Sequence, residues 1–194
     1  MIRTDDDSHH NKICNNLLFG TISTSGICIK GLNTASHNIL FNASMLTGGA
    51  GNTVDPHSTL SHNIFFHTEK IEKGFHIGLK KVREGLDYNV YYNTDDPSTA
   101  SLEKFLKTNS SQLADRNSIS DNPLFKDIEQ GDLSFRTGSP AGALGIDPIS
   151  ASNLSKVGTS QDPFLKRYLG KLPLKSLHKR SNGGKAHTAN ELDL

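Results

Sequence analysis

The chain has 194 residues, with 21 Lys and Arg against 20 Asp and Glu, so one domain with a formal net charge of +1 is expected. The balanced charge excludes a polybasic nucleic-acid binder, and no nucleic-acid partner is expected. Hydrophobic residues make up 34% of the chain and support a modest core, but no apolar run reaches the roughly 18 residues of a membrane span.

A short phrase recurs along the first half of the chain. Each copy has an aliphatic residue three positions before an Asn or His, and these aliphatic residues are Ile13, Ile39, Ile64 and Val90. Their steps of 26, 25 and 26 residues suit one turn of a parallel β-helix, in which equivalent residues stack at about 4.8 Å. We therefore expect the four side chains to form one buried column inside the coil.

The polar position of the phrase predicts a second column. Asn16, Asn42 and Asn93 are expected at a bend after the strand, where their amides donate and accept hydrogen bonds along the column. His67 takes the same position. A structural ring that replaces an amide is the expected role of His67, and a ligand role is the alternative.

A second apolar run follows the phrase, at 26–29, 52–54 and 75–77. Each repeat should therefore contain at least two strands, because these runs are rich in β-branched and aromatic residues and are bounded by turn residues. Cys14 and Cys28 fall on predicted strands and are interpreted as small core residues.

The period is lost after residue 93. Leu102, Phe105 and Leu106 have helical spacing and predict a short helix over 100–107. Turn and strand composition follows at 121–125 and 131–135. We expect residues 1–93 to form the coils, 94–158 a C-terminal cap, and 159–194 a basic, partly disordered tail, for which contact with an anionic glycan or a membrane surface is the alternative.

Two clusters of ionisable side chains suggest acid and base chemistry. One spans 5–10 and contains three consecutive Asp residues and two His residues; adjacent carboxylates raise one another's pKa, and they also suit calcium, the one cofactor that the sequence suggests. The other is Asp55 with His57, which point to the same side of an extended strand. A solvated turn is the structural alternative for both clusters. The remaining His residues lack the spacing of a metal centre.

Several phrases resemble the right-handed parallel β-helix repeat family, which is pectate-lyase-like and includes many exported bacterial carbohydrate-active enzymes. The resemblance covers about residues 2–158 and is most specific in the closing phrases at 118–127, 131–133, 138–141 and 145–146. It implies a right-handed parallel β-helix, here with about three to four coils, and an extracellular or periplasmic location. Because family members have more coils and a signal peptide, the chain is expected to be the C-terminal part of a longer protein or a shortened relative.

The resemblance also implies site residues. Asp5 falls on an acid of the family phrase at 2–8, and Asp55-Pro56-His57-Ser58 resembles a phrase that begins with Glu in the family. These parallels assign catalysis to Asp5, Asp55 and His57. Substrate binding is expected of Asp7, His9 and Lys30. No metal ligand is assigned.

The repeat places the three catalytic candidates in one segment of the coil. Asp5 lies eight residues before Ile13, and Asp55 and His57 lie nine and seven before Ile64, so one solvent-facing groove should hold all three. The expected function is cleavage of a polysaccharide or oligosaccharide, by a glycoside hydrolase or a polysaccharide lyase, in a monomer. The alternative is a non-catalytic glycan-binding or structural β-helix.

Overall fold

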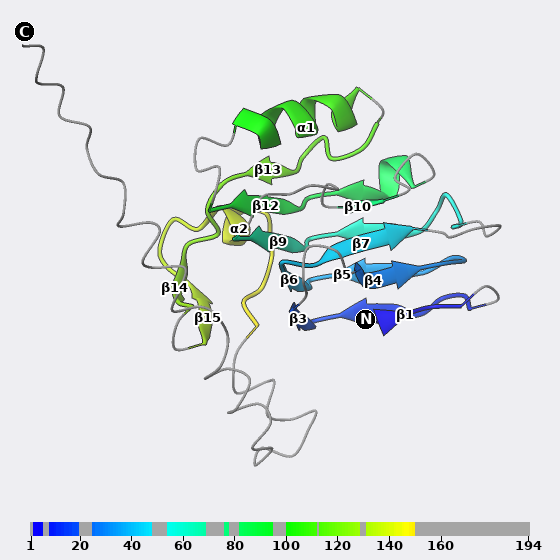
Figure 1. Ribbon diagram of the computed structural model, residues 1–194, viewed down its shortest axis with the longest axis horizontal. Coiled ribbons are helices and arrows are strands. Elements are labelled where there is room, and N and C mark those ends of the chain that lie inside the picture. The colour runs from blue at the N-terminus through cyan, green and yellow to red at the C-terminus, as the bar shows by residue number, and fades with distance from the viewer. Residues whose placement is uncertain are drawn as a thin grey trace, which may run out of the picture.

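The computed structural model describes residues 2–5, 8–19, 25–47, 54–68, 76–77, 82–94, 100–111, 113–128 and 131–149, so the predicted tail at 159–194 lies outside the described residues. The described chain winds as a parallel β-solenoid of about three turns, with its coils stacked from β1 towards α1 (Figure 1). The predicted all-β solenoid is confirmed.

Each coil contributes strands to three parallel sheets, where the sequence predicted at least two strands. The first sheet contains β1 (Ile2–Arg3), β4 (Ser25–Ile29), β7 (Ser44–Thr47) and β10 (His76–Ile77). The second contains β2 (Lys12–Cys14), β5 (Thr34–Ser36), β8 (Thr59–Ser61) and β11 (Leu86–Asp87), which follows the 3-10 helix η2 (Arg83–Gly85). The third contains β3 (Leu17–Phe19), β6 (Ile39–Phe41), β9 (Ile64–His67), β12 (Val90–Asn93) and β13 (Ile119–Ser120).

The predicted aliphatic column has the right register for three residues and the wrong register for Ile13. In the third sheet Ile39, Ile64 and Val90 are in register, but the residue paired with Ile39 in the preceding coil is Leu17. Ile13 belongs to the second sheet and pairs with Ala35. The prediction misplaces the first coil by four residues, the distance from Ile13 to Leu17. The second and third sheets each have a three-residue strand followed by a bend, so a similar phrase occurs in both.

The column of Ile39, Ile64 and Val90 also faces the outside of the coil, not its interior. The interior cluster contains the neighbours Leu40, Phe65 and Tyr91, packed with residues of the other two sheets. Ile39, Ile64 and Val90 belong to a second buried cluster on the other face of the third sheet. This sheet is therefore apolar on both faces, and a period-two pattern cannot show which face is inside.

Two further expectations about the strands need correction. Val54 does not pair with Ile27; it bridges to Gly31, while the partner of Ile27 is Met45 in β7, a strand that the sequence analysis did not predict. Cys28 is buried as predicted, but Cys14 is exposed because it lies on the outer face of the second sheet.

An asparagine ladder joins the coils at the bend between the second and third sheets. The members are Asn16, Asn38, Asn63 and Asn89. The backbone N–H and the side-chain amide of each residue donate to the Oδ1 of the next, at 2.9–3.2 Å from Asn63 to Asn89 and 3.0–3.1 Å from Asn38 to Asn63. Asn16 was predicted to share a column with Asn42 and Asn93, but it belongs to this ladder and they do not. Asn42 hydrogen-bonds to Thr68, and Asn93 pairs with His67 in the third sheet.

The ladder ends on a buried carboxylate. The backbone N–H of Asn89 donates to the Ser118 hydroxyl at 2.9 Å, and this hydroxyl donates to Asp115 Oδ1 at 2.7 Å. Tyr91 and Asn109 also donate to the Asp115 carboxylate, at 2.9 and 2.7 Å. Burial raises the pKa of Asp115, and burial is also the main cause of the raised pKa of Tyr91.

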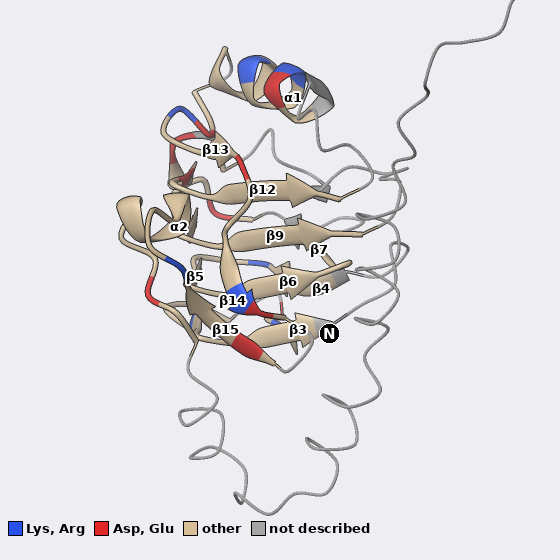
Figure 2. Ribbon diagram, turned by 90° about the vertical axis from the view of Figure 1, so that its left-hand side faces the viewer, with Lys and Arg blue, Asp and Glu red and all other residues tan. Residues whose placement is uncertain are grey.

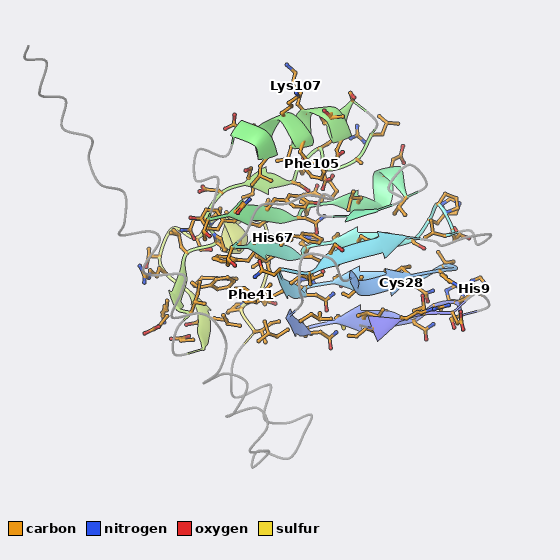
Figure 3. All side chains as sticks on the ribbon, in the orientation of Figure 1. His9, Cys28, Phe41, His67, Phe105 and Lys107 are labelled. Carbon is orange, nitrogen blue, oxygen red and sulfur yellow. The ribbon has the colours of Figure 1, made fainter. Side chains whose placement is uncertain are left out.

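The chain after the coils packs on two parts of the solenoid. The predicted helix forms as α1 (Ala100–Ser110) and lies over the last coil, with Leu102 in the interior cluster. Phe105 points from α1 towards the coils, edge-on to Tyr91 at 5.4 Å, and Lys107 points away (Figure 3).

The closing segment packs on the outer face of the third sheet. It contains the antiparallel pair β14 (Phe125–Asp127) and β15 (Asp132–Phe135), followed by α2 (Pro140–Ala143), and these elements lie across the strands of that sheet (Figure 2). Their buried side chains belong to the same cluster as Ile39, Ile64 and Val90; they are Phe125, Leu133 and Ala141. The sequence predicted these strands, but it placed the segment over the end of the coil.

We expect Asn63→Ala to destabilise the protein by about 3 kcal/mol or more. The change removes the acceptor of two hydrogen bonds from Asn38 and the donor to Ala35, and it leaves buried polar groups without partners. Asn16→Ala, at the partly exposed start of the described ladder, should cost about 1 kcal/mol. Urea unfolding of both variants tests this, and equal losses would contradict a ladder whose interior members matter most.

Candidate functional site

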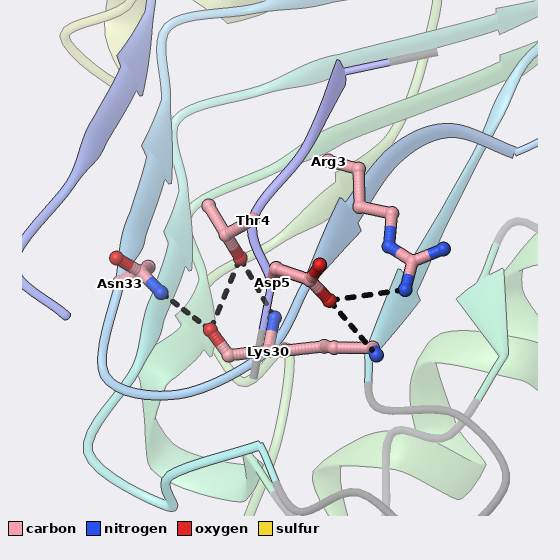
Figure 4. Close-up of polar contacts among 5 residues, drawn as sticks. All are labelled: Arg3, Thr4, Asp5, Lys30 and Asn33. Carbon is pink, nitrogen blue, oxygen red and sulfur yellow. Dashed lines mark hydrogen bonds and ion pairs between the residues drawn. The ribbon is translucent and has the colours of Figure 1, made fainter. Parts of the chain in front are cut away.

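Asp5 lies at the turn between the first and second sheets, within a small cluster of charges. Its carboxylate contacts Arg3 at 3.1 Å and the ammonium of Lys30 at 3.4 Å (Figure 4). The side chain of Asp5 is 73% exposed, whereas that of Lys30 is only 7% exposed. The hydrogen bond from Arg3, followed by that from Lys30, lowers the pKa of Asp5, in contrast to the raised pKa expected from adjacent carboxylates. This carboxylate can act as a base or pair with a cation, but it is a poor proton donor.

Lys30 is held by its backbone as well as by its ammonium. The Thr4 hydroxyl donates to the Lys30 carbonyl at 3.0 Å and accepts from the Lys30 N–H at 2.8 Å, and the Asn33 amide donates to the same carbonyl. The residue predicted to bind substrate therefore also joins the first coil to the second.

Asp55 and His57 form a tight turn before β8. Asp55 Oδ1 accepts the backbone N–H of His57 at 2.8 Å, and His57 itself is exposed. The Asp55 N–H donates to the Gly31 carbonyl at 3.1 Å, next to the Lys30 that pairs with Asp5. The two predicted carboxylates thus lie in the same segment of the coil, two coils apart, but their described hydrogen bonds and ion pairs do not join them.

His9 lies over the turn of the next coil. Its Nδ1 accepts the Leu32 N–H at 3.2 Å. Gly31 has φ +65°, and a Cβ there would come within 2.5 Å of the Ser8 carbonyl, so only glycine fits below this turn. Asp7, the third residue predicted to bind substrate, lies outside the described residues.

A column of stacked rings, which the repeat pattern did not predict, lies on the bend before the asparagine ladder. His37 and His62 stack with ring centroids 5.2 Å apart and planes inclined by 3°; His62 and Tyr88 stack at 5.3 Å and 7°. We call these three residues the ring column. Each has a left-handed backbone with φ 56°. Asn15, at the same bend of the preceding coil, is also left-handed, with φ 58°. Their position directly before Asn38, Asn63 and Asn89 is the signal that could have revealed the column.

The ring column borders a polar face, the outer face of the second sheet. Alternate residues of its strands are buried, so the remaining ones face outwards. These form rows of hydroxyl groups in register, Thr34 with Thr59 and Ser36 with Ser61. Tyr88 at the end of the ring column is 41% exposed. The arrangement presents hydroxyl groups and ring edges at intervals of one coil.

Burial lowers the pKa of His62 first, and the neighbouring His37 lowers it further, while Asp87 raises it. Asp87 accepts two hydrogen bonds from Asn117, at 2.6 Å from its backbone N–H and 2.7 Å from its amide. His62 therefore favours its uncharged form, because burial removes a charged ring from water and a charge on the neighbouring His37 would repel it.

His67 is a buried residue of the third sheet, near the middle of the molecule (Figure 3). It is 2% exposed, and burial lowers its pKa to about 4, partly offset by a hydrogen bond to the Ala43 backbone. The structural role expected for His67 fits this position better than a ligand role, since solvent has almost no access to the ring.

Among the residues that the structure describes, His, Cys, Asp and Glu form no group of three or more that could hold a metal ion. Asp6 and Asp7 of the suggested calcium cluster lie outside that part of the chain. No helix in the described part is long and apolar enough to cross a membrane.

Comparison of the chain with family models, curated proteins and solved structures gives no match. The assignment of the fold as a parallel β-solenoid therefore rests on the strand pairing of this structure.

We expect acid to destabilise the protein through His67. Its pKa is about 4 in the folded protein and about 6.5 when unfolded, so the unfolded state binds more protons between these values. The free energy of unfolding should fall by up to about 3 kcal/mol as the pH drops from 6.5 to 4.

Urea unfolding across this pH range tests the expectation. His67→Asn introduces the residue that Asn93 provides in the paired position, and it should remove most of the slope. His57→Asn, at an exposed imidazole, is the control and should retain the slope. A slope that persists in His67→Asn would show that other groups cause it.

Proposed function

We propose that this chain binds a polysaccharide along the outer face of the second sheet without cleaving it. The ring column carries this proposal, because its rings follow the axis of the solenoid and repeat at 5.2 and 5.3 Å, once per coil. A glycan is a chain that repeats a polar unit, so a linear row of polar rings at a regular spacing suits it.

The chemistry of the face also suits sugars. Sugar hydroxyls both donate and accept hydrogen bonds, and so do the outward hydroxyls of Thr34, Ser36, Thr59 and Ser61. Because the rings stack face to face, their edges remain for polar contact, and an imidazole edge offers a donor and an acceptor. The groups are held on strands and by stacking, so little side-chain freedom is lost when a ligand binds.

Binding should weaken about tenfold in Tyr88→Asn, because a ring and a hydroxyl are lost while the left-handed bend keeps a residue that tolerates it. Affinity electrophoresis and calorimetry with a panel of soluble polysaccharides test this. His10→Asn is the matched control, since His10 is exposed, has φ 60° and lies outside the ring column. Failure of the unmodified protein to bind any polysaccharide would overturn the proposed function.

Cleavage of a polysaccharide is the second candidate, by a glycoside hydrolase or a lyase of the pectate-lyase-like kind. The position of Asp5 and Asp55 in the same coil segment favours it, because two strand spacings are about 10 Å and opposed carboxylates flank a scissile sugar linkage at distances of this order. The lowered pKa of Asp5 would suit a base, leaving the acid to Asp55 or His57.

An assay for new reducing ends with the same panel separates the two candidates. If the chain is an enzyme, Asp5→Asn and His57→Ala should each lower the rate at least 100-fold. His10→Asn should leave the rate unchanged. Binding without any new reducing ends or unsaturated products would favour the non-catalytic function.

A further inference from the structure

We propose that the ring column binds neutral rather than acidic polysaccharide, and that acidification releases this ligand by protonating His62, which stacks between His37 and Tyr88. The inference rests on the proposed function and adds to it the class of ligand and the way in which binding is controlled.

The charges around the face favour a neutral ligand. In the described strands of the second sheet, the charged side chains are Lys12 in the first coil and Asp87 in the last, and they balance. Between them lie hydroxyl groups and the two imidazoles. An acidic glycan would meet the Asp87 carboxylate beside the ring column without a row of cations to compensate for it.

The stacked geometry explains the response to pH. The rings of His37 and His62 are nearly parallel at 5.2 Å, so protonation of both places two like charges in adjacent layers. Tyr88 covers the other face of His62, and Asp87 is the carboxylate that acts on that ring. The left-handed bends fix both backbones, so the rings can separate only by leaving the row.

A neutral ligand depends on the uncharged rings in a second way. An uncharged imidazole accepts a hydrogen bond at one nitrogen, and protonation turns this acceptor into a donor. A sugar hydroxyl that donates to the ring loses its partner at that moment. Binding and protonation therefore oppose each other, and the affinity should fall as the pH falls below that at which His62 takes up its proton.

Calorimetry of the full chain with soluble β-glucan, galactomannan and polygalacturonate, at pH 7.5 and at pH 5.0, tests the inference. The neutral polymers should bind at pH 7.5, and their dissociation constants should rise at pH 5.0, by at most about 30-fold because the pKa of His62 lies below its ordinary value of 6.5. Polygalacturonate should bind more weakly than the neutral polymers at pH 7.5, where the rings are uncharged. Urea unfolding at pH 5.0 confirms that the protein remains folded.

The variant His37→Asn/His62→Asn isolates the cause. Asn is the residue that the first coil has at the equivalent bend, as Asn15, so the left-handed backbone should be retained at both substituted positions. Neutral polymers should bind this variant more weakly than the unmodified protein, and with the same affinity at both pH values. His10→Asn should keep the full pH response.

NMR titration of the imidazoles supplies a readout that does not depend on the variants. A neutral polymer should lower the pH at which His62 titrates in the unmodified protein, because it stabilises the uncharged ring. A preference for polygalacturonate at pH 7.5, an unchanged pH response in the double variant, or a raised titration point of His62 would each overturn the inference while leaving polysaccharide binding intact. If no polymer bound at either pH, both the proposed function and this inference would fail.

Discussion

Amide hydrogen bonds between successive bends fix the register of the whole solenoid. Its second-sheet strands have only two or three residues, too few for strand pairing alone to prevent slippage. Asn38, Asn63 and Asn89 remove this freedom, because each side chain accepts from the coil before it and donates to a backbone carbonyl there, to Ile13, Ala35 and Leu60 respectively. A slip of one residue would break every rung and leave these fully buried amides without partners.

The ladder has a direction, and the direction accounts for the buried Asp115. Every member donates towards the last coil, so the final group must accept without needing to donate. A carboxylate meets this condition, and four or more lone pairs let it also accept from Tyr91 and Asn109. Asn109 belongs to α1, so the same carboxylate that ends the ladder fixes the helix over the last coil. The cost is a buried group whose pKa is raised by desolvation.

The sequence predicts the solenoid and helix α1, but not the register of the first coil or which face of the third sheet is inside. A repeat of 25 to 26 residues reveals coiling, yet it cannot distinguish Ile13 from Leu17, because each is an aliphatic residue in a three-residue strand. Nor does it reveal that the closing segment buries the outside of the third sheet, since that contact depends on the tertiary position of Phe125 and Leu133.

The sequence likewise predicts some features of the candidate site and misses others. Spacing placed Asp5 and Asp55 in one coil segment, but it could not show that Arg3 and Lys30 already pair with Asp5. The ring column was missed because its members, His37, His62 and Tyr88, differ in type and share only their position before the ladder. A search for identical residues does not detect a shared backbone conformation.

The ladder also determines where the surface can carry chemistry. An Asn that turns inwards to the ladder must follow a residue in the left-handed region, and the side chain of that residue points away from the core. His37, His62 and Tyr88 are therefore free of the packing that constrains interior positions, although the spacing of the coils still sets one ring upon the next. Asn15 shows that a small amide suffices for the bend itself. Rings at three successive positions exceed what the fold requires, and this excess is the physical reason why we propose a binding function for this edge of the solenoid.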